Sequence, residues 1–204
     1  MLRFRLPKTQ NFKSVITIDN FEGTKYRLAD NWFDFIPQTN TPIEYLEIGT
    51  FHGANAISVN KSYAKYQDSK IYCVDPWTNY SEYPEYKGKQ NINYDIFMNN
   101  ISNTNEASKF IIKRGFSNDV VPTFEDNKFD IIYIDGNHEP EFVLEDAVLS
   151  FRKLKVGGYM IFDDYGWGGP GLTKRGIDGF ITGYHKRIKV LGSANTQVFL
   201  QKTK

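Results

Sequence analysis

The chain has 204 residues and a formal net charge of +1. This length fits one domain that can bury a hydrophobic core without disulfides or a structural metal. The balanced charge excludes a strongly basic, nucleic-acid-binding surface. The single cysteine, Cys73, excludes an internal disulfide and fits a reducing compartment. Neither a signal-peptide core nor an apolar run of the ~20 residues that span a bilayer is present. We expect a soluble, cytoplasmic protein without membrane or nucleic-acid partners.

Residues 1–40 are expected to form an N-terminal arm and a helix. Residues 14–18 fit either a strand or a packed arm, and both interpretations stay open. The segment Thr24–Ile36 has a partial apolar face, and Pro37 is a helix terminator. We interpret this helix as a cover for the sheet rather than as a substrate lid.

The first clear strand is Ile43–Gly49, which runs through a glycine turn into a helix, Ala54–Tyr66. A strand, a glycine turn and a helix bring backbone N–H groups close to a bound ligand. The glycine spacing differs from the dinucleotide fingerprint, and the Lys-Ser/Thr pair of a triphosphate loop is missing. Glu47, two residues before Gly49, would suit a ligand with a cationic amine. His52 is interpreted as a loop residue.

The second strand, Lys70–Asp75, also ends in an acid. An acid at this strand tip, roughly 20 residues past the glycine turn, suits the hydroxyls of a ribose. Trp77 could wall that ligand or pack in the core, and the two alternatives stay open. Cys73 lies inside the strand, so we interpret it as a small buried residue rather than a nucleophile.

Residues 78–103 are expected to form a substrate-side loop and helix. The loop Thr78–Lys89 has no periodicity and fits a mobile segment that closes over substrate, whereas Gln90–Asn103 has helical spacing. A third strand, Phe110–Lys113, leads to a short helix that ends near Phe124. Ser117 either contacts the ligand's base end or caps that helix.

Two further apolar strands end in carboxylates. They are Phe129–Asp135 and Gly158–Asp164, and the segment between them, Glu139–Lys155, has helical spacing. Strand, helix and strand make one right-handed crossover, so the two acidic tips should be neighbours. Three carboxylates and one imidazole are then expected close together at this edge of the sheet: Asp135, Asp163, Asp164 and His138.

The chain closes with a glycine-rich loop at 165–171, a helix at Leu172–Lys186 and two strands, Ile188–Gly192 and Gln197–Leu200, joined by a turn at Asn195–Thr196. Five strand–helix units and this hairpin predict an α/β fold. We expect a single Rossmann-like domain over residues 1–204, whose seven-stranded, mostly parallel sheet has helices on both faces and an antiparallel C-terminal hairpin.

The order of acid-tipped strands resembles class I S-adenosylmethionine-dependent methyltransferases. Three motifs narrow the resemblance: YIDGNH at Tyr133–His138, GGYMIFDDYG at Gly157–Gly166 and GIDGF at 176–180. Together they are similar to the metal-dependent macrocin-type sugar O-methyltransferases. The resemblance runs from about residue 43 to 180. It leaves out the loop Thr78–Lys89, so it does not define the substrate.

The resemblance implies a role for each matching residue. The residues implied in cofactor binding are Glu47, Gly49, Thr50, Gly53, Asp75, Trp77, Ser117 and Asp135. The residues implied as Mg²⁺ ligands are Asp135, Asp163 and Asp164. His138 is implied as the general base, with Asp135 as the second catalytic residue.

Elementary chemistry agrees with these roles. Three carboxylates without a cysteine pair favour a hard cation such as Mg²⁺ over zinc. A sugar hydroxyl holds its proton tightly at neutral pH. A Lewis acid would loosen this proton, and a histidine that titrates near neutrality could accept it.

The predicted function is therefore Mg²⁺-dependent O-methylation of a sugar hydroxyl on a glycan or nucleotide sugar. Two alternatives stay open, a catechol-type small-molecule O-methyltransferase and a non-catalytic cofactor-binding or assembly module. The resemblance and aromatic residues such as Trp167 are consistent with a homo-oligomer. The Asn-, Lys-, Ile- and Tyr-rich composition is typical of an AT-rich genome, such as that of a bacterium or of a virus acting in a host cell.

Overall fold

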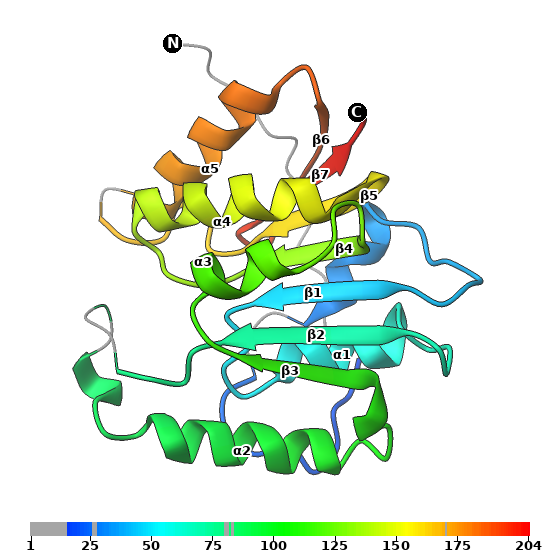
Figure 1. Ribbon diagram of the computed structural model, residues 1–204, viewed down its shortest axis with the longest axis vertical. Helices are drawn as coiled ribbons and strands as arrows, with labels where there is room; N and C mark the ends of the chain where they lie inside the picture. Colours follow the sequence, from blue (N-terminus) through cyan, green and yellow to red (C-terminus); the bar gives the residue numbers. More distant parts are fainter. Residues whose placement is uncertain (1–15, 26–27, 80–81, 83, 170) are drawn as a thin grey trace.

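The computed structural model describes residues 16–25, 28–79, 82, 84–169 and 171–204. In these ranges the chain forms a seven-stranded sheet with the order β3-β2-β1-β4-β5-β7-β6 (Figure 1). The strands are β1 (Glu44–Ile48), β2 (Lys70–Asp75), β3 (Phe110–Arg114), β4 (Phe129–Ile134), β5 (Leu154–Phe162), β6 (Ile188–Ala194) and β7 (Gln197–Lys202). Strands β1 to β5 pair in parallel, and β7 pairs antiparallel with β5 and β6. The predicted sheet and its antiparallel hairpin are confirmed.

Helices cover both faces of this sheet, as predicted (Figure 1). The α-helices are α1 (Ala54–Ser62), α2 (Gln90–Ser102), α3 (Ser117–Val120), α4 (Pro140–Lys153) and α5 (Leu172–Tyr184), and the 3-10 helices are η1 (Ala29–Asp34), η2 (Pro84–Tyr86), η3 (Ala107–Lys109) and η4 (Val121–Thr123). Helices α1, α2 and η1 contribute to one core, and α4, α5 and η4 to the other. None of the helices in the described ranges has the length and hydrophobicity needed to cross a bilayer.

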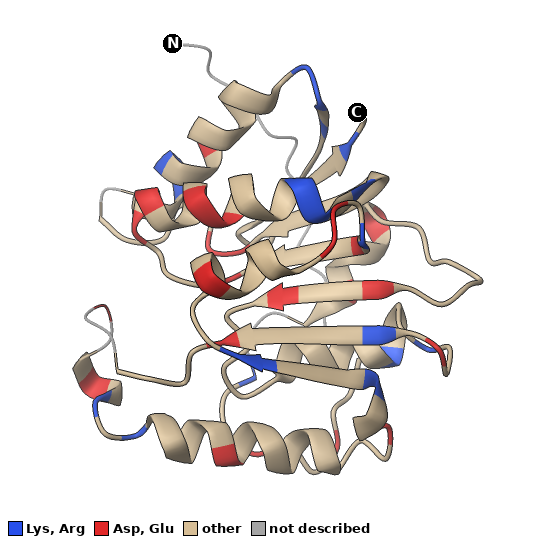
Figure 2. Cartoon of the chain, viewed as in Figure 1, with Lys and Arg blue, Asp and Glu red and all other residues tan. Residues whose placement is uncertain are grey.

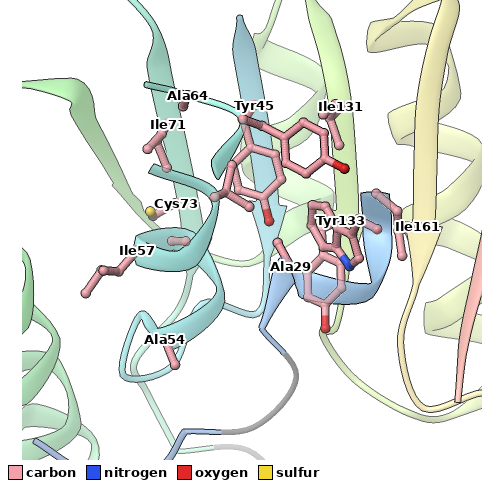
Figure 3. Close-up of a cluster of buried hydrophobic side chains, with 14 of the residues drawn as sticks. Ala29, Tyr45, Ala54, Ile57, Ala64, Ile71, Cys73, Ile131, Tyr133 and Ile161 are labelled. Carbon is pink, nitrogen blue, oxygen red and sulfur yellow. The ribbon is translucent and has the colours of Figure 1, made fainter. Parts of the chain in front are cut away.

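The two cores explain why the strands read as continuous apolar runs. Successive residues of a strand point to opposite faces. Strand β4 therefore sends Ile131 and Tyr133 into one core and Ile132 and Ile134 into the other. Figure 3 shows Ile131 and Tyr133 among the side chains of the first core, to which Ala29 of η1 also belongs. A sheet covered on both faces needs apolar residues at every central position.

The helix predicted over residues 24–36 is wrong in type and length. The structure has only the 3-10 helix η1 in this region, and positions 26–27 lie outside the described residues. The backbone N–H of Thr24 donates to His52 Nδ1 at 3.1 Å, so this end of the segment is bonded to a different part of the chain. Trp32 of η1 is fully buried and packs against Tyr45 and Tyr133, so η1 covers the sheet.

Other predicted boundaries shift by a few residues. Helix α4 ends at Lys153, and β5 starts at the next residue because Leu154 pairs with Phe129 of β4. The pairing register then slips beside Gly157, which has a φ of +87°. Helix α1 ends at Ser62, earlier than predicted. Residues 16–18 have no regular structure, and the rest of the 14–18 segment lies outside the described residues.

Candidate active site

A cavity of about 740 Å³ opens at the carboxyl ends of the parallel strands. Each of the strands β1 to β5 contributes a lining residue at or just after its end: Gly49, Asp75, Gly115, Asp135 and Asp163. Figure 2 shows acidic residues at the tips of β1 and β2 on this edge. Open α/β sheets bind their ligands in this position.

The structure places the residues predicted to bind the cofactor in two groups. Those that line the cavity are Gly49, Asp75, Ser117 and Asp135. The others, which are described but are not among the lining residues, are Glu47, Thr50, Gly53 and Trp77. Trp77 is buried, packs on Phe97 and donates from Nε1 to the Phe51 carbonyl at 3.0 Å, which is the packing alternative for this residue.

The glycine turn after β1 requires glycine for a steric reason. Gly49 has a φ of +83°, and a Cβ atom built on it would lie 1.9 Å from the carbonyl oxygen of Asp135. The tips of β1 and β4 therefore touch through backbone alone. Phe51, two residues on, has a φ of +48°, and its N–H donates to Asp75 Oδ2 at 2.9 Å. The carboxylate of Asp75 at the end of β2 thus holds the glycine turn after β1 in place by a hydrogen bond.

We predict that Gly49→Ala unfolds the protein or lowers its free energy of unfolding by more than about 3 kcal/mol. The matched control is Gly157→Ala, because Gly157 also has a positive φ, of +87°, but a Cβ there would meet nothing within 4 Å. The left-handed backbone alone costs about 1–2 kcal/mol. Urea unfolding of both variants measures the difference. Equal losses would show that the contact with β4 does not constrain this turn.

Asp75 is half-buried, and its carboxylate accepts backbone N–H groups from Phe51 at 2.9 Å and Trp77 at 2.8 Å. Burial raises the pKa of Asp75 above its usual value, although these hydrogen bonds act in the opposite direction. A carboxylate has about four lone-pair sites, more than the backbone donors fill. Asp75 therefore faces the cavity with acceptor capacity left for a ligand hydroxyl.

Glu47 lies in the core beside the cavity. Its Oε2 accepts the Tyr45 hydroxyl at 2.5 Å and the Asn55 side-chain amide at 3.0 Å, and the residue is 1% exposed. Burial raises the pKa of Glu47 to about 8, against the effect of these two donors. Glu47 is therefore mostly uncharged at neutral pH in this structure, and its predicted attraction for a cationic amine stays a prediction.

The raised pKa of Glu47 predicts a pH-dependent stability. The unfolded chain releases this proton near the usual value of 4.5 and the folded chain near 8, so stability falls as the pH rises between these values. The free energy of unfolding of Glu47→Gln should not fall in this way, so relative to the wild type it should rise by up to about 4 kcal/mol between pH 5 and pH 8. Chemical unfolding of both proteins at the two pH values tests this. An equal stability difference between variant and wild type at both pH values would contradict the prediction.

An acidic cluster lies at the tips of β4 and β5. One ligand atom each from Asp135, His138 and Asp164 lies within 4.8 Å of the others, so the structure brings these predicted residues together. Asp163 lines the same cavity but is not part of this group. Its Oδ2 accepts the Tyr133 hydroxyl, and its Oδ1 accepts the Asp164 N–H at 2.7 Å.

The electrostatics of the acidic cluster fit a cation. Burial, and then the neighbouring charges of Asp163 and Asp164, raise the pKa of Asp135 well above its usual range. Desolvated carboxylates that repel one another are stabilised by a shared positive charge. Oxygen donors of this kind suit a hard divalent cation such as Mg²⁺. The donor set therefore fits the metal implied by the resemblance.

His138 is held from two sides. Its Nδ1 lies 2.6 Å from Glu82 Oε1, and its Nε2 lies 3.0 Å from Asp164 Oδ2. Its backbone N–H also donates to the Glu82 carboxylate, at 3.2 and 3.3 Å. Burial lowers the pKa of His138, but the bonds with Asp164 and Glu82 outweigh it and raise the pKa to about 10. The Trp167 ring packs beside the imidazole at 4.5 Å.

The sequence reasoning did not single out Glu82. This residue lies in the loop Thr78–Lys89, where the only signal was an acidic side chain in a segment expected on the substrate side. The sequence indicates Tyr133 only as part of the YIDGNH motif and Gln197 only as part of a strand. In the structure the Tyr133 hydroxyl donates to Asp163, and the Gln197 amide donates to the Tyr133 hydroxyl.

The strand order, the glycine turn and the cavity at the strand tips define the class of fold, a Rossmann-like α/β domain. The chain belongs to the family described as Methyltransferase domain, whose model matches residues 46–165, more than half of the chain.

A curated relative is described as the uncharacterized protein R132 of Acanthamoeba polyphaga mimivirus. It is 27% identical over 151 residues, which cover 72% of this chain and 63% of that protein, so the match spans less than two thirds of the viral relative.

Two solved structures with a similar fold are methyltransferases. The O-methyltransferase TomG of Streptomyces achromogenes, in complex with SAM, has a TM-score of 0.59 at 16% identity, covering 79% of this chain and 73% of TomG. The methyltransferase PaMTH1 of Podospora anserina, with bound SAH, has a TM-score of 0.59 at 17% identity, covering 85% of this chain and 77% of PaMTH1. At these identities the likeness shows the fold.

Proposed function

We propose that this methyltransferase transfers the methyl group of S-adenosylmethionine to a sugar hydroxyl and uses Mg²⁺ in doing so. The proposal rests on one observation: a single cavity is lined by Gly49 and Asp75, at the ends of β1 and β2 (the Gly49–Asp75 edge), and by the acidic cluster of Asp135, His138 and Asp164. A donor and an activated acceptor could therefore meet in one space, and holding two reactants together supplies much of a rate enhancement.

The cofactor end of the proposed site is the Gly49–Asp75 edge. Gly49 lines the cavity, so a ligand there would meet the backbone of the glycine turn. Asp75 has free acceptor capacity for the ribose hydroxyls. Ser117, the first residue of α3, also lines the cavity, and we assign it to the adenine end. The SAM and SAH bound to the two similar structures support this choice of cofactor.

The acceptor end of the proposed site is the acidic cluster. Asp135 and Asp164 would hold the cation, with Asp163 beside them. When bound, the cation would supply Lewis-acid polarisation of the acceptor hydroxyl. Nε2 of His138 faces the cluster and would take the hydroxyl proton, because Nδ1 is occupied by Glu82. With both ring nitrogens against carboxylates, the pKa of about 10 keeps His138 protonated at neutral pH. His138 would therefore act as a base only after Asp164 has turned to the cation and released Nε2.

The choice of a sugar rests on the sequence motif, in which a histidine follows the first acid of the cluster by three residues. The test is to incubate the protein with labelled S-adenosylmethionine, Mg²⁺ and either rhamnose-type glycans or catechols. We expect label on the glycan. Label on catechol alone would overturn the sugar assignment in favour of a catechol-type enzyme. Cofactor binding without any transfer would favour a non-catalytic module.

A further inference from the structure

A chain of buried hydrogen bonds runs from the acidic cluster into the first core, as far as Trp32 and Asn31 of η1. Trp32 Nε1 donates to Gln197 Oε1 at 3.0 Å, and Asn31 donates to the same oxygen at 3.2 Å. Gln197 Nε2 lies 3.2 Å from the Tyr133 hydroxyl, which in turn contacts Asp163 Oδ2. Gln197 is 0% exposed, Tyr133 1% and Trp32 0%, so water does not replace any of these bonds. Buried polar groups of this kind require protein partners.

The direction of every bond in this chain is fixed by donor chemistry. The Trp32 indole N–H can only donate, so the oxygen of the Gln197 amide must face it. The amide NH₂ of Gln197 therefore faces Tyr133 and donates to its oxygen. A tyrosine hydroxyl has a single hydrogen. Because its oxygen already accepts from Gln197, this hydrogen is directed at the cluster, where Asp163 is the nearer acceptor and Asp135 Oδ2 lies at 3.5 Å.

We propose that Tyr133 is a positioning residue that holds Asp163 at the acidic cluster, and that Gln197 sets the direction of the Tyr133 hydroxyl. The proposal rests on the cation site of the proposed function. Asp163 Oδ1 accepts the N–H of Asp164, whose φ of +52° is a left-handed conformation that needs such support. The orientation imposed by Tyr133 thus reaches Asp164, one of the grouped ligand residues.

The test measures cation affinity rather than turnover. Binding of Mn²⁺, as a spectroscopic substitute for Mg²⁺, is followed by electron paramagnetic resonance in the wild type and in Tyr133→Phe. Loss of a residue that orients metal ligands typically weakens metal binding by about 10- to 100-fold, and we expect a loss in this range. The matched control is Tyr63→Phe, because the buried Tyr63 hydroxyl lies in the same core but donates to the Ile36 carbonyl at 2.9 Å. This variant should bind Mn²⁺ like the wild type.

The outcomes separate this proposal from the cation site itself. If the wild type does not bind Mn²⁺, the cation site fails and the positioning role fails with it. If the wild type binds Mn²⁺ and Tyr133→Phe binds it equally well, only the positioning role is overturned. Should Tyr133→Phe not fold, Gln197→Met tests the same chain one step further from the cluster. Weaker Mn²⁺ binding in that variant supports the proposal, and unchanged binding overturns it.

Discussion

Replacing Asp164 with Ala is expected to abolish methyl transfer while S-adenosylmethionine still binds. Asp164 lies in the group of potential ligand atoms and also contacts His138 Nε2 at 3.0 Å. The variant thus removes part of the cation site and one partner of the proposed base. Because Lewis-acid stabilisation supplies several kcal/mol, we expect a loss of at least about 10³-fold in rate. The Gly49–Asp75 edge does not depend on Asp164, so affinity for the product cofactor should stay within about twofold of the wild type.

The control for this variant is Asp95→Ala. Asp95 is an exposed acid on α2 and is not among the residues that line the cavity. Its loss should leave both transfer and cofactor binding unchanged. EDTA should abolish methyl transfer by the wild type, as Asp164→Ala does, and addition of Mg²⁺ should restore it. Full activity in EDTA would reject the metal role. Parallel loss of cofactor binding in Asp164→Ala would instead indicate general damage to the cavity.

The fold was predictable because its signals are local and repeated. Each parallel strand is a short apolar run, and the segments between most of them have helical spacing or turn residues. The acids at the strand tips were predictable for the same reason: a carboxylate directly after a buried strand must lie at the sheet edge. The convergence of Asp135, His138 and Asp164 follows from one crossover between neighbouring strands.

The remaining features depend on contacts between distant segments. Glu82 reaches His138 over 56 positions, and its loop has no periodicity that could indicate this. Gln197 looks like an ordinary strand residue, and only the partners at Trp32 and Tyr133 show its role. The sequence does not show that Tyr45, two residues before Glu47 in the same strand, donates its hydroxyl to the Glu47 carboxyl group in the core. Such pairings need the three-dimensional arrangement.

Replacing His138 with Ala should lower the rate of the chemical step by roughly 10²-fold or more, because general-base catalysis typically contributes that much. The affinity for S-adenosylmethionine should change little, since His138 lies at the acceptor end. Single-turnover transfer of a labelled methyl group measures this step. The matched control is His185→Ala, because His185 is exposed on the surface and its Nδ1 lies 3.0 Å from the Thr182 carbonyl oxygen. An unchanged rate in His138→Ala would assign the proton transfer to a different group.

The role of Glu82 can be separated from that of the base itself. Its carboxylate accepts from Nδ1 of His138 and so leaves Nε2 as the nitrogen that faces Asp164. Glu82→Gln keeps an acceptor oxygen at this position and should retain much more activity than Glu82→Ala, whose kcat should fall by roughly 10-fold with little change in KM. Glu85→Gln, at an exposed acid of the neighbouring η2, is the control and should be silent. If the Gln and Ala variants of Glu82 were equally impaired, the charge of Glu82 rather than its hydrogen bond would be what His138 requires.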